Sequence, residues 1–140
     1  MNGQNAVSTG RTSSARVLVV DDDPTVGRAM EVLMSKAGFA PVVCGTGAAA
    51  LQSAGAGDVA GAIVDIHLPD MNGLTLSQRL RECLGPTTPI VILSGDNSID
   101  TLRALPDAGA TYFFAKPVNG ARLVEQMKEW VRAANASRLS

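Results

Sequence analysis

Acidic residues follow two separate apolar runs of this sequence, directly where each run ends. The triplet Asp21–Asp23 follows Val17–Val20, and Asp65 follows the run 62–64. Such runs suit strands buried on both faces of a parallel sheet, whose carboxyl ends share one edge. Carboxylates gathered at one edge repel one another unless one takes a proton or a cation enters. We therefore expect the chemistry of this chain at Asp65.

Polar groups of complementary type end two later apolar runs. Ser94 follows 90–93, and Lys116 follows 112–115. A cluster that offers only oxygen ligands suits a hard cation such as Mg²⁺, which keeps some waters and leaves room for a phosphate oxygen. A carboxylate such as Asp65 can attack phosphorus as a nucleophile, while a lysine opposite it neutralises the transferring group. The Ser94 hydroxyl offers a donor to that group.

The elements that position these residues alternate along the chain. Apolar runs predict strands, and amphipathic stretches predict helices that alternate with them. This order indicates an α/β fold, a (βα)5 doubly wound five-stranded parallel sheet in the flavodoxin-like order 2-1-3-4-5. Strands are expected at 17–20, 40–44, 61–65, 90–94 and 112–115, and helices at 24–37, 47–56, around 76–84, from about 98 to before Pro106, and at 119–134.

The length of 140 residues predicts one ordinary domain. Residues 1–15 are rich in Asn, Gly, Ser and Thr and include one large aliphatic residue, Val7, so we expect a flexible N-terminal tail. The folded domain is expected at 16–134, and the polar residues 135–140 are expected to fray. The readout of any signal should then come from a separate protein or from self-pairing.

The overall composition excludes several classes of partner. A formal net charge of −1 with 18% charged residues gives no electrostatic footprint for nucleic acid or an anionic membrane. No apolar run approaches the roughly 20 residues that span a bilayer, and the N-terminus lacks an apolar targeting segment. Cys44 and Cys83 lack the spacing of a zinc or redox pair and are interpreted as packed free thiols in a reducing compartment. We therefore expect a cytoplasmic protein.

Two alternative interpretations concern the glycines at 45–50 and Asp65 itself. The segment 45–50 matches the dinucleotide pattern G-x-G-x-x-A, but it follows the second strand and leaves Asp21, Asp22 and Lys116 unexplained. Asp65 on its own could merely cap the helix that follows it.

Single aromatic residues and the one histidine have plain structural interpretations. The side chain of His67 is expected to face solvent on a loop. Large rings must be buried in a domain of this size, so most aromatic side chains are expected in the core. These are Tyr112, Phe113, Phe114 and Trp130.

Taken together, the motifs at the strand ends resemble a response-regulator receiver domain of two-component signal transduction, similar to a single-receiver chemotaxis regulator. The likeness spans residues 16–134. It departs from the family at Phe113, where a tyrosine is common, and at Pro106 in the fourth helix. The motifs are Val19-Val20-Asp21-Asp22-Asp23-Pro24, Val64-Asp65, Leu68-Pro69-Asp70-Met71-Asn72-Gly73, Leu93-Ser94-Gly95, Ala108-Gly109-Ala110 and Phe113-Phe114-Ala115-Lys116-Pro117.

The resemblance implies a role for each site residue. Asp65 would be the phosphoacceptor, and Mg²⁺ would be bound directly by Asp22, Asp65 and the backbone carbonyl of His67. Asp21 would act on the metal through water. Lys116 would sense the phosphoryl group, with Ser94 as the switch hydroxyl and Phe113 as the switch aromatic residue.

The resemblance also implies a function in a phosphorelay. A histidine kinase or histidine phosphotransfer protein would donate the phosphoryl group, and the chain would promote only its own phosphorylation and dephosphorylation rather than act as an enzyme on an outside substrate. Output is expected through the face of the fourth helix, fifth strand and fifth helix, toward a downstream protein or a second copy. The alternative is a pseudo-receiver that binds partners without phosphorylation.

Overall fold

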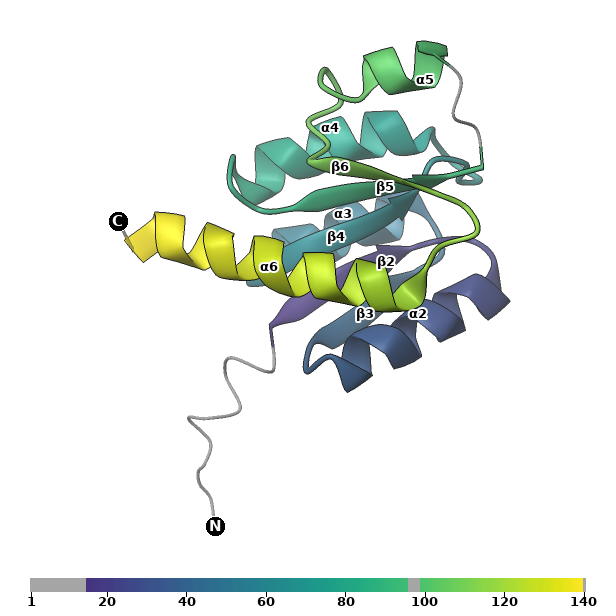
Figure 1. The fold of residues 1–140 in the computed structure, drawn as a ribbon. Helices are drawn as coiled ribbons and strands as arrows, with labels where there is room; N and C mark the ends of the chain where they lie inside the picture. Colours follow the sequence, from purple (N-terminus) through teal and green to yellow (C-terminus); the bar gives the residue numbers. More distant parts are fainter. Residues whose placement is uncertain (1–14, 96–98, 140) are drawn as a thin grey trace.

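The computed structural model describes residues 15–95 and 99–139, in which a parallel five-stranded sheet lies between two layers of helices (Figure 1). The strand order β3-β2-β4-β5-β6 confirms the predicted order 2-1-3-4-5. The predicted N-terminal tail lies almost wholly outside the described residues. The strands are β2 (Arg16–Val20), β3 (Ala40–Cys44), β4 (Val59–Asp65), β5 (Ile90–Ser94) and β6 (Tyr112–Ala115), and the helices are α2 (Pro24–Lys36), α3 (Gly47–Gly55), α4 (Gly73–Leu84), α5 (Ile99–Ala104) and α6 (Gly120–Leu139).

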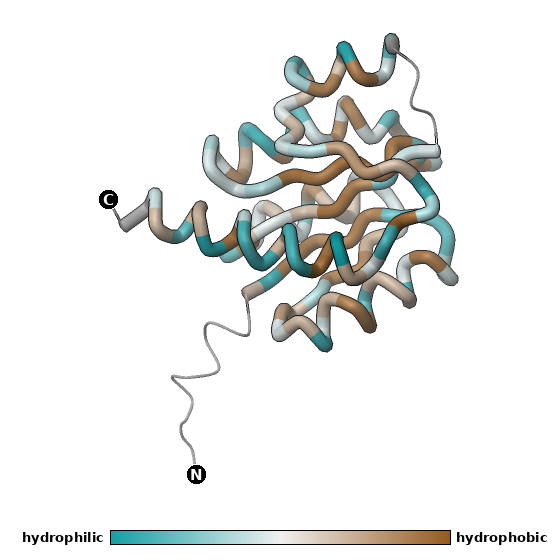
Figure 2. Tube along the Cα trace, viewed as in Figure 1, coloured by the Kyte–Doolittle hydropathy of each residue, from teal (hydrophilic) through white to brown (hydrophobic). Residues whose placement is uncertain are grey.

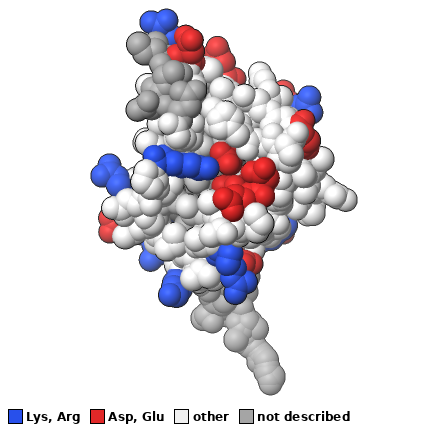
Figure 3. All heavy atoms as spheres, turned by 90° about the vertical axis from the view of Figure 1, so that its right-hand side faces the viewer, with Lys and Arg blue, Asp and Glu red and all other residues white. Residues whose placement is uncertain are grey.

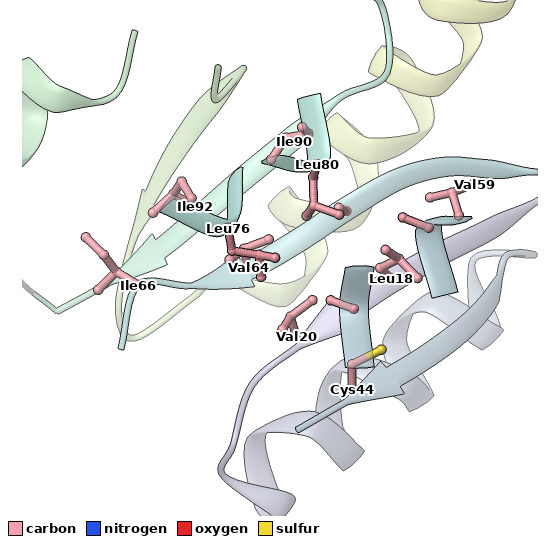
Figure 4. Close-up of a cluster of buried hydrophobic side chains, with 13 residues drawn as sticks. Leu18, Val20, Cys44, Val59, Val64, Ile66, Leu76, Leu80, Ile90 and Ile92 are labelled. Atoms are coloured by element: carbon pink, nitrogen blue, oxygen red, sulfur yellow. The ribbon is translucent and has the colours of Figure 1, made fainter. Parts of the chain in front are cut away.

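Successive residues of the central strands point to opposite faces of the sheet and so build two cores. Leu18 and Val64 pack with α3 and α4, as Figure 4 shows for that cluster. Val19 and Ile63 pack on the other face against Met30 of α2 and residues of α6. The hydropathy pattern follows this layering, with apolar strands inside and polar residues on the outer sides of the helices (Figure 2).

Local signals fix the starts and ends of the helices around the site. The Asp23 side chain accepts a hydrogen bond from the Thr25 backbone N–H and caps α2, with Pro24 in its first turn. Gly85 follows α4 with a positive φ of 90°, which glycine tolerates. Helix α5 ends at Ala104, shortly before Pro106, as predicted.

Helix α6 is longer than predicted. It runs to Leu139 rather than ending at Ala134, and Ala134 is buried. The extension contains Ala136 and no glycine or proline, so nothing in the local sequence ends the helix there. Although α6 is long, none of the helices within residues 15–95 and 99–139 is both long and apolar enough to cross a membrane.

The structure corrects two predictions of burial. Cys44 is a buried free thiol as predicted, but the free thiol of Cys83 is exposed. The buried face of α4 is formed by Gly73, Leu76, Ser77 and Leu80. Cys83, in the last turn, lies at the margin of this face and is therefore exposed.

Tyr112 is the other correction. It is 49% exposed rather than part of the core, because it begins the edge strand β6 and only one side of its ring is covered. The covering group is Trp130 of α6, whose ring stacks on that of Tyr112 at 4.0 Å between centroids. Phe113 and Phe114 are half-buried.

Candidate functional site

The predicted acidic cluster forms at the carboxyl edge of the sheet. One carboxylate oxygen from each of Asp21, Asp22 and Asp65 lies within 4.8 Å of the others. Asp21 and Asp22 directly follow β2, while Asp65 ends the neighbouring strand β4. Figure 3 views this edge and shows acidic side chains gathered beside a basic one. Asp21 and Asp65 are buried and Asp22 is exposed, so the cluster opens to solvent on the side of Asp22.

Lys116 supplies the positive charge opposite these carboxylates. Its Nζ lies 3.2 Å from Oδ2 of Asp65 and 3.8 Å from Oδ2 of Asp21. The backbone places it there, because the Lys116 N–H donates to the carbonyl of Ser94 at the end of the adjacent strand. The ammonium group therefore faces both buried carboxylates from β6.

Backbone N–H groups orient the two buried carboxylates. Oδ1 of Asp21 accepts from the Asp23 N–H at 2.9 Å, and Oδ1 of Asp65 accepts from the His67 N–H at 3.2 Å. Oδ2 of Asp21 is buried without a hydrogen-bond partner among the described residues. Burial raises the pKa of Asp21, and the charge of Asp65 raises it further, against the Asp23 N–H and Lys116, which lower it.

This donor set fits a hard divalent cation. The cluster offers only carboxylate oxygens, and the orphaned Oδ2 of Asp21 is a buried acceptor that needs a partner. Exposed Asp22 leaves room for water ligands. A cation here would offset the repulsion that raises the pKa of Asp21.

Close backbone packing fixes the position of Asp65. Gly73 at the start of α4 lies against the end of β4, and a Cβ atom there would overlap the Asp65 carbonyl oxygen. Asn72, rather than Asp65, caps α4, because its side chain accepts from the Leu74 N–H at 2.7 Å. The interpretation of Asp65 as a simple helix cap is therefore wrong.

The remaining predicted residues lie around the cluster. Ser94 is buried at the carboxyl end of β5, next to the strand that bears Asp65. Phe113 pairs in register with Ile92 and packs against the core on the α3 and α4 side. The side chain of His67 is exposed, as predicted.

The N-terminus of α3, which carries the G-x-G-x-x-A pattern, is occupied from within the chain. The two carboxylate oxygens of Asp70 accept from the N–H groups of Gly47 and Ala48, at 2.8 and 2.9 Å. These are the groups that would hold a phosphate in a dinucleotide site. Asp70 lies 23 residues from Gly47 in the chain, so the sequence analysis did not predict this contact.

A second contact also escaped the sequence analysis. The guanidinium of Arg81 in α4 donates to the carbonyls of Gly85, Thr88 and Gly109 at 2.6 to 2.9 Å. It thereby joins the end of α4 to the segment before β6. Backbone carbonyls occur at every residue, so no side-chain pattern could have marked these partners.

Comparison with known proteins agrees with this geometry. The family model for the response regulator receiver domain matches residues 17–128. The chain is 39% identical over 123 residues to the sensory/regulatory protein RpfC of Xanthomonas campestris, covering 85% of this chain and 17% of that protein. It is 34% identical over 122 residues to the transcriptional regulatory protein KdpE of Mycobacterium tuberculosis, covering 86% of this chain and 53% of that protein. The chain thus spans about half or less of these relatives.

A solved structure shares the fold over nearly its whole length. The response regulator receiver domain protein (CheY-like) from Methanospirillum hungatei superposes with a TM-score of 0.83 at 27% identity. The match covers 89% of this chain and 98% of that one.

Proposed function

This chain belongs to the response regulator receiver domain family of two-component systems, and we propose that it accepts a phosphoryl group on Asp65 from a histidine kinase or a histidine phosphotransfer protein. The observation that carries the proposal is the approach of Lys116 Nζ to the Asp65 carboxylate at 3.2 Å, within a cluster of three aspartates. In this proposal residues 16–134 form the receiver unit. The protein would act in the cytoplasm, a reducing compartment in which its two cysteines stay as free thiols.

In the proposed transfer, a carboxylate oxygen of Asp65 attacks the phosphorus of a phosphohistidine. The new O–P bond forms as the P–N bond breaks, and the electron pair of that bond stays on the imidazole nitrogen, which takes up a proton. Lys116 offsets negative charge on the transferring oxygens. Dephosphorylation ends the signal: water attacks the phosphorus, the bond to the Asp65 oxygen breaks, and the carboxylate is restored as inorganic phosphate leaves. The chain acts on no other substrate in this scheme.

Mg²⁺ is part of the proposal. Asp22, Asp65 and the backbone carbonyl of His67 would hold the ion directly, and Asp21 would act through water. When bound, the ion supplies positive charge for the phosphoryl oxygens. The carboxylate set supports this assignment, because it includes a buried Asp21 oxygen that has no hydrogen-bond partner within the described residues.

The proposed output runs through Ser94 and Phe113 to the face formed by α5, β6 and α6. Ser94 and Phe113 lie on neighbouring strands, and Phe113 is half-buried. A phosphoryl group on Asp65 would draw the Ser94 hydroxyl inward, and the Phe113 ring would move into the space that this frees. A groove on this face is lined by Phe113, Arg122 and Trp130, among others. Tyr112, whose exposed ring stacks on Trp130, also lines it. These features suit a downstream protein or a second copy of the chain.

Incubation with a small-molecule phosphodonor, followed by intact mass, tests the proposed function. With Mg²⁺ the wild-type chain should gain the mass of one phosphoryl group, and hydroxylamine should remove it. A chelator should suppress the gain. A chain that folds and stays unlabelled under both conditions would instead be a pseudo-receiver, which binds partners without this chemistry.

A further inference from the structure

The loop between β4 and α4 is closed at its base and held at its tip. At the base, His67 and Asn72 form an antiparallel bridge, and the Gly73 N–H donates to the Ile66 carbonyl at 2.7 Å. The tip, residues 68–71, reaches across to the first turn of α3. The loop therefore joins the end of the Asp65 strand to a helix that contributes no residue to the acidic cluster.

Two side chains hold this tip. The Asp70 carboxylate accepts from the N–H groups of Gly47 and Ala48, one to each oxygen, at 2.8 and 2.9 Å. The Met71 side chain lies so close to Gly47 that a Cβ atom there would be 2.6 Å from its sulfur. An anion is favoured at the N-terminus of a helix, and the same N–H groups lower the pKa of Asp70.

We propose that Asp70 is a positioning residue for the phosphorylation site, through the loop that bears His67. This inference rests on the proposed function. The His67 N–H donates to Oδ1 of Asp65 at 3.2 Å, and the His67 carbonyl is a proposed metal ligand. If the Asp70 carboxylate is lost, the tip loses its hydrogen bonds to α3, and both groups of His67 gain freedom. Outer contacts of this kind orient the ligands of a metal.

The competing explanation is that Asp70 only caps α3. The chain offers a matched test of it, because the Thr46 side chain caps the same helix by accepting from the Ala49 N–H at 3.1 Å. Among the described residues it forms no hydrogen bond to the loop. Loss of charge near the acidic cluster is a second possible cause of any effect. Asp23→Asn controls for it, because Asn at that position can still cap α2.

The experiment compares Asp70→Asn, Thr46→Ala and Asp23→Asn with the wild type by titration with Mg²⁺ alone. Asn keeps the shape of Asp70 but offers one acceptor and turns an amide N–H group toward the helix. We expect Asp70→Asn to weaken Mg²⁺ affinity on the order of tenfold, with both controls near the wild type. Equal effects of Asp70→Asn and either control would overturn the inference.

Amide hydrogen exchange separates failure of this inference from failure of the proposed function. In Asp70→Asn the N–H groups of Gly47, Ala48 and His67 should all exchange faster, whereas Thr46→Ala should leave His67 unchanged. If only Gly47 and Ala48 respond, Asp70 is a cap and the inference is wrong. A wild-type chain that binds no Mg²⁺ contradicts the proposed function, and the exchange of His67 still decides whether Asp70 positions the loop.

Discussion

Lys116 Nζ lies 3.2 Å from Oδ2 of Asp65 and is the positive group that faces the acidic cluster from β6. Two of the three aspartates of that cluster are buried. The ammonium group therefore offsets repulsion that Mg²⁺ would otherwise have to relieve. If Mg²⁺ binds as proposed, the ion and the ammonium group would share this task, and each would partly compensate for loss of the other.

Lys116→Met tests this sharing. Without the ammonium group the metal-free protein retains the full repulsion among the carboxylates, so it should melt at a lower temperature than the wild type in a chelator. Saturating Mg²⁺ should then raise the melting temperature more in the variant than in the wild type. Thermal unfolding with and without Mg²⁺ measures both shifts. An equal or smaller Mg²⁺ shift in Lys116→Met would show that the lysine does not offset the cluster.

The raised pKa of Asp21 predicts a pH dependence of stability in the metal-free protein. Burial is the largest cause of the shift, so the folded state holds this proton more tightly than the unfolded state does. Stability from this group is fully present below the pKa of the unfolded chain and is lost as pH rises through the folded pKa. Asp21→Asn, which does not titrate, should therefore be more stable than the wild type at neutral pH in a chelator.

Urea unfolding from about pH 4 to pH 7 checks the sign of this effect. The advantage of Asp21→Asn should shrink as pH falls through the raised pKa. A gap that stays constant, or widens toward low pH, would contradict the assigned cause. Added Mg²⁺ should make the wild type more stable than Asp21→Asn at neutral pH, because the Asp21 carboxylate would interact with the ion.

A pair of buried hydroxyls predicts opposite effects on stability. Ser77 Oγ in α4 is buried with no hydrogen-bond partner in the part of the chain that the structure describes, whereas Thr88 Oγ1 donates to the Leu84 carbonyl at 2.9 Å. Ser77→Ala should leave stability unchanged or raise it by about 1 kcal/mol, and Thr88→Val should lower it by about 1 kcal/mol. Urea denaturation gives both values. Similar losses in the two variants would mean that the Ser77 hydroxyl has a stabilising partner.

Most of the fold could be predicted because its signals are local. Asp23 and Pro24 start α2, Gly85 ends α4, and the apolar run Tyr112–Ala115 is a strand with those bounds. The carboxyl ends of the strands then place Asp21, Asp65 and Lys116 together, since the parallel order alone brings them to one edge.

What the sequence could not show depends on contacts between distant segments. Cys83 is exposed because of the orientation in which α4 packs on the sheet. Tyr112 is exposed because it lies on an edge strand. The Asp70 carboxylate and the Arg81 guanidinium bind backbone groups of other segments. Such partners leave no side-chain pattern, so only the folded chain identifies them.

The proposed switch predicts that a Ser94 variant can be phosphorylated on Asp65 without the conformational change that normally follows. Ser94→Ala should still be phosphorylated, because Asp65 and Lys116 are untouched, but it removes the hydroxyl that the phosphoryl group would draw inward. A charge-assisted hydrogen bond contributes roughly 1.5–3 kcal/mol, which is about one to two decades in the population of the switched state. Amide exchange across 99–115, with and without beryllofluoride, should change in the wild type and little in Ser94→Ala. An equal change in both would remove Ser94 from the switch.

The identity of the phosphoacceptor is tested most directly by intact mass of three chains treated with the same phosphodonor and Mg²⁺. Asp23→Asn is the matched control, because Asp23 lies in the same acidic loop but its side chain caps α2 by accepting from the Thr25 N–H. The wild type and Asp23→Asn should each gain one hydroxylamine-labile phosphoryl group, and Asp65→Asn should gain none. Full labelling of Asp65→Asn, or loss of labelling in Asp23→Asn alone, would contradict the assignment of Asp65.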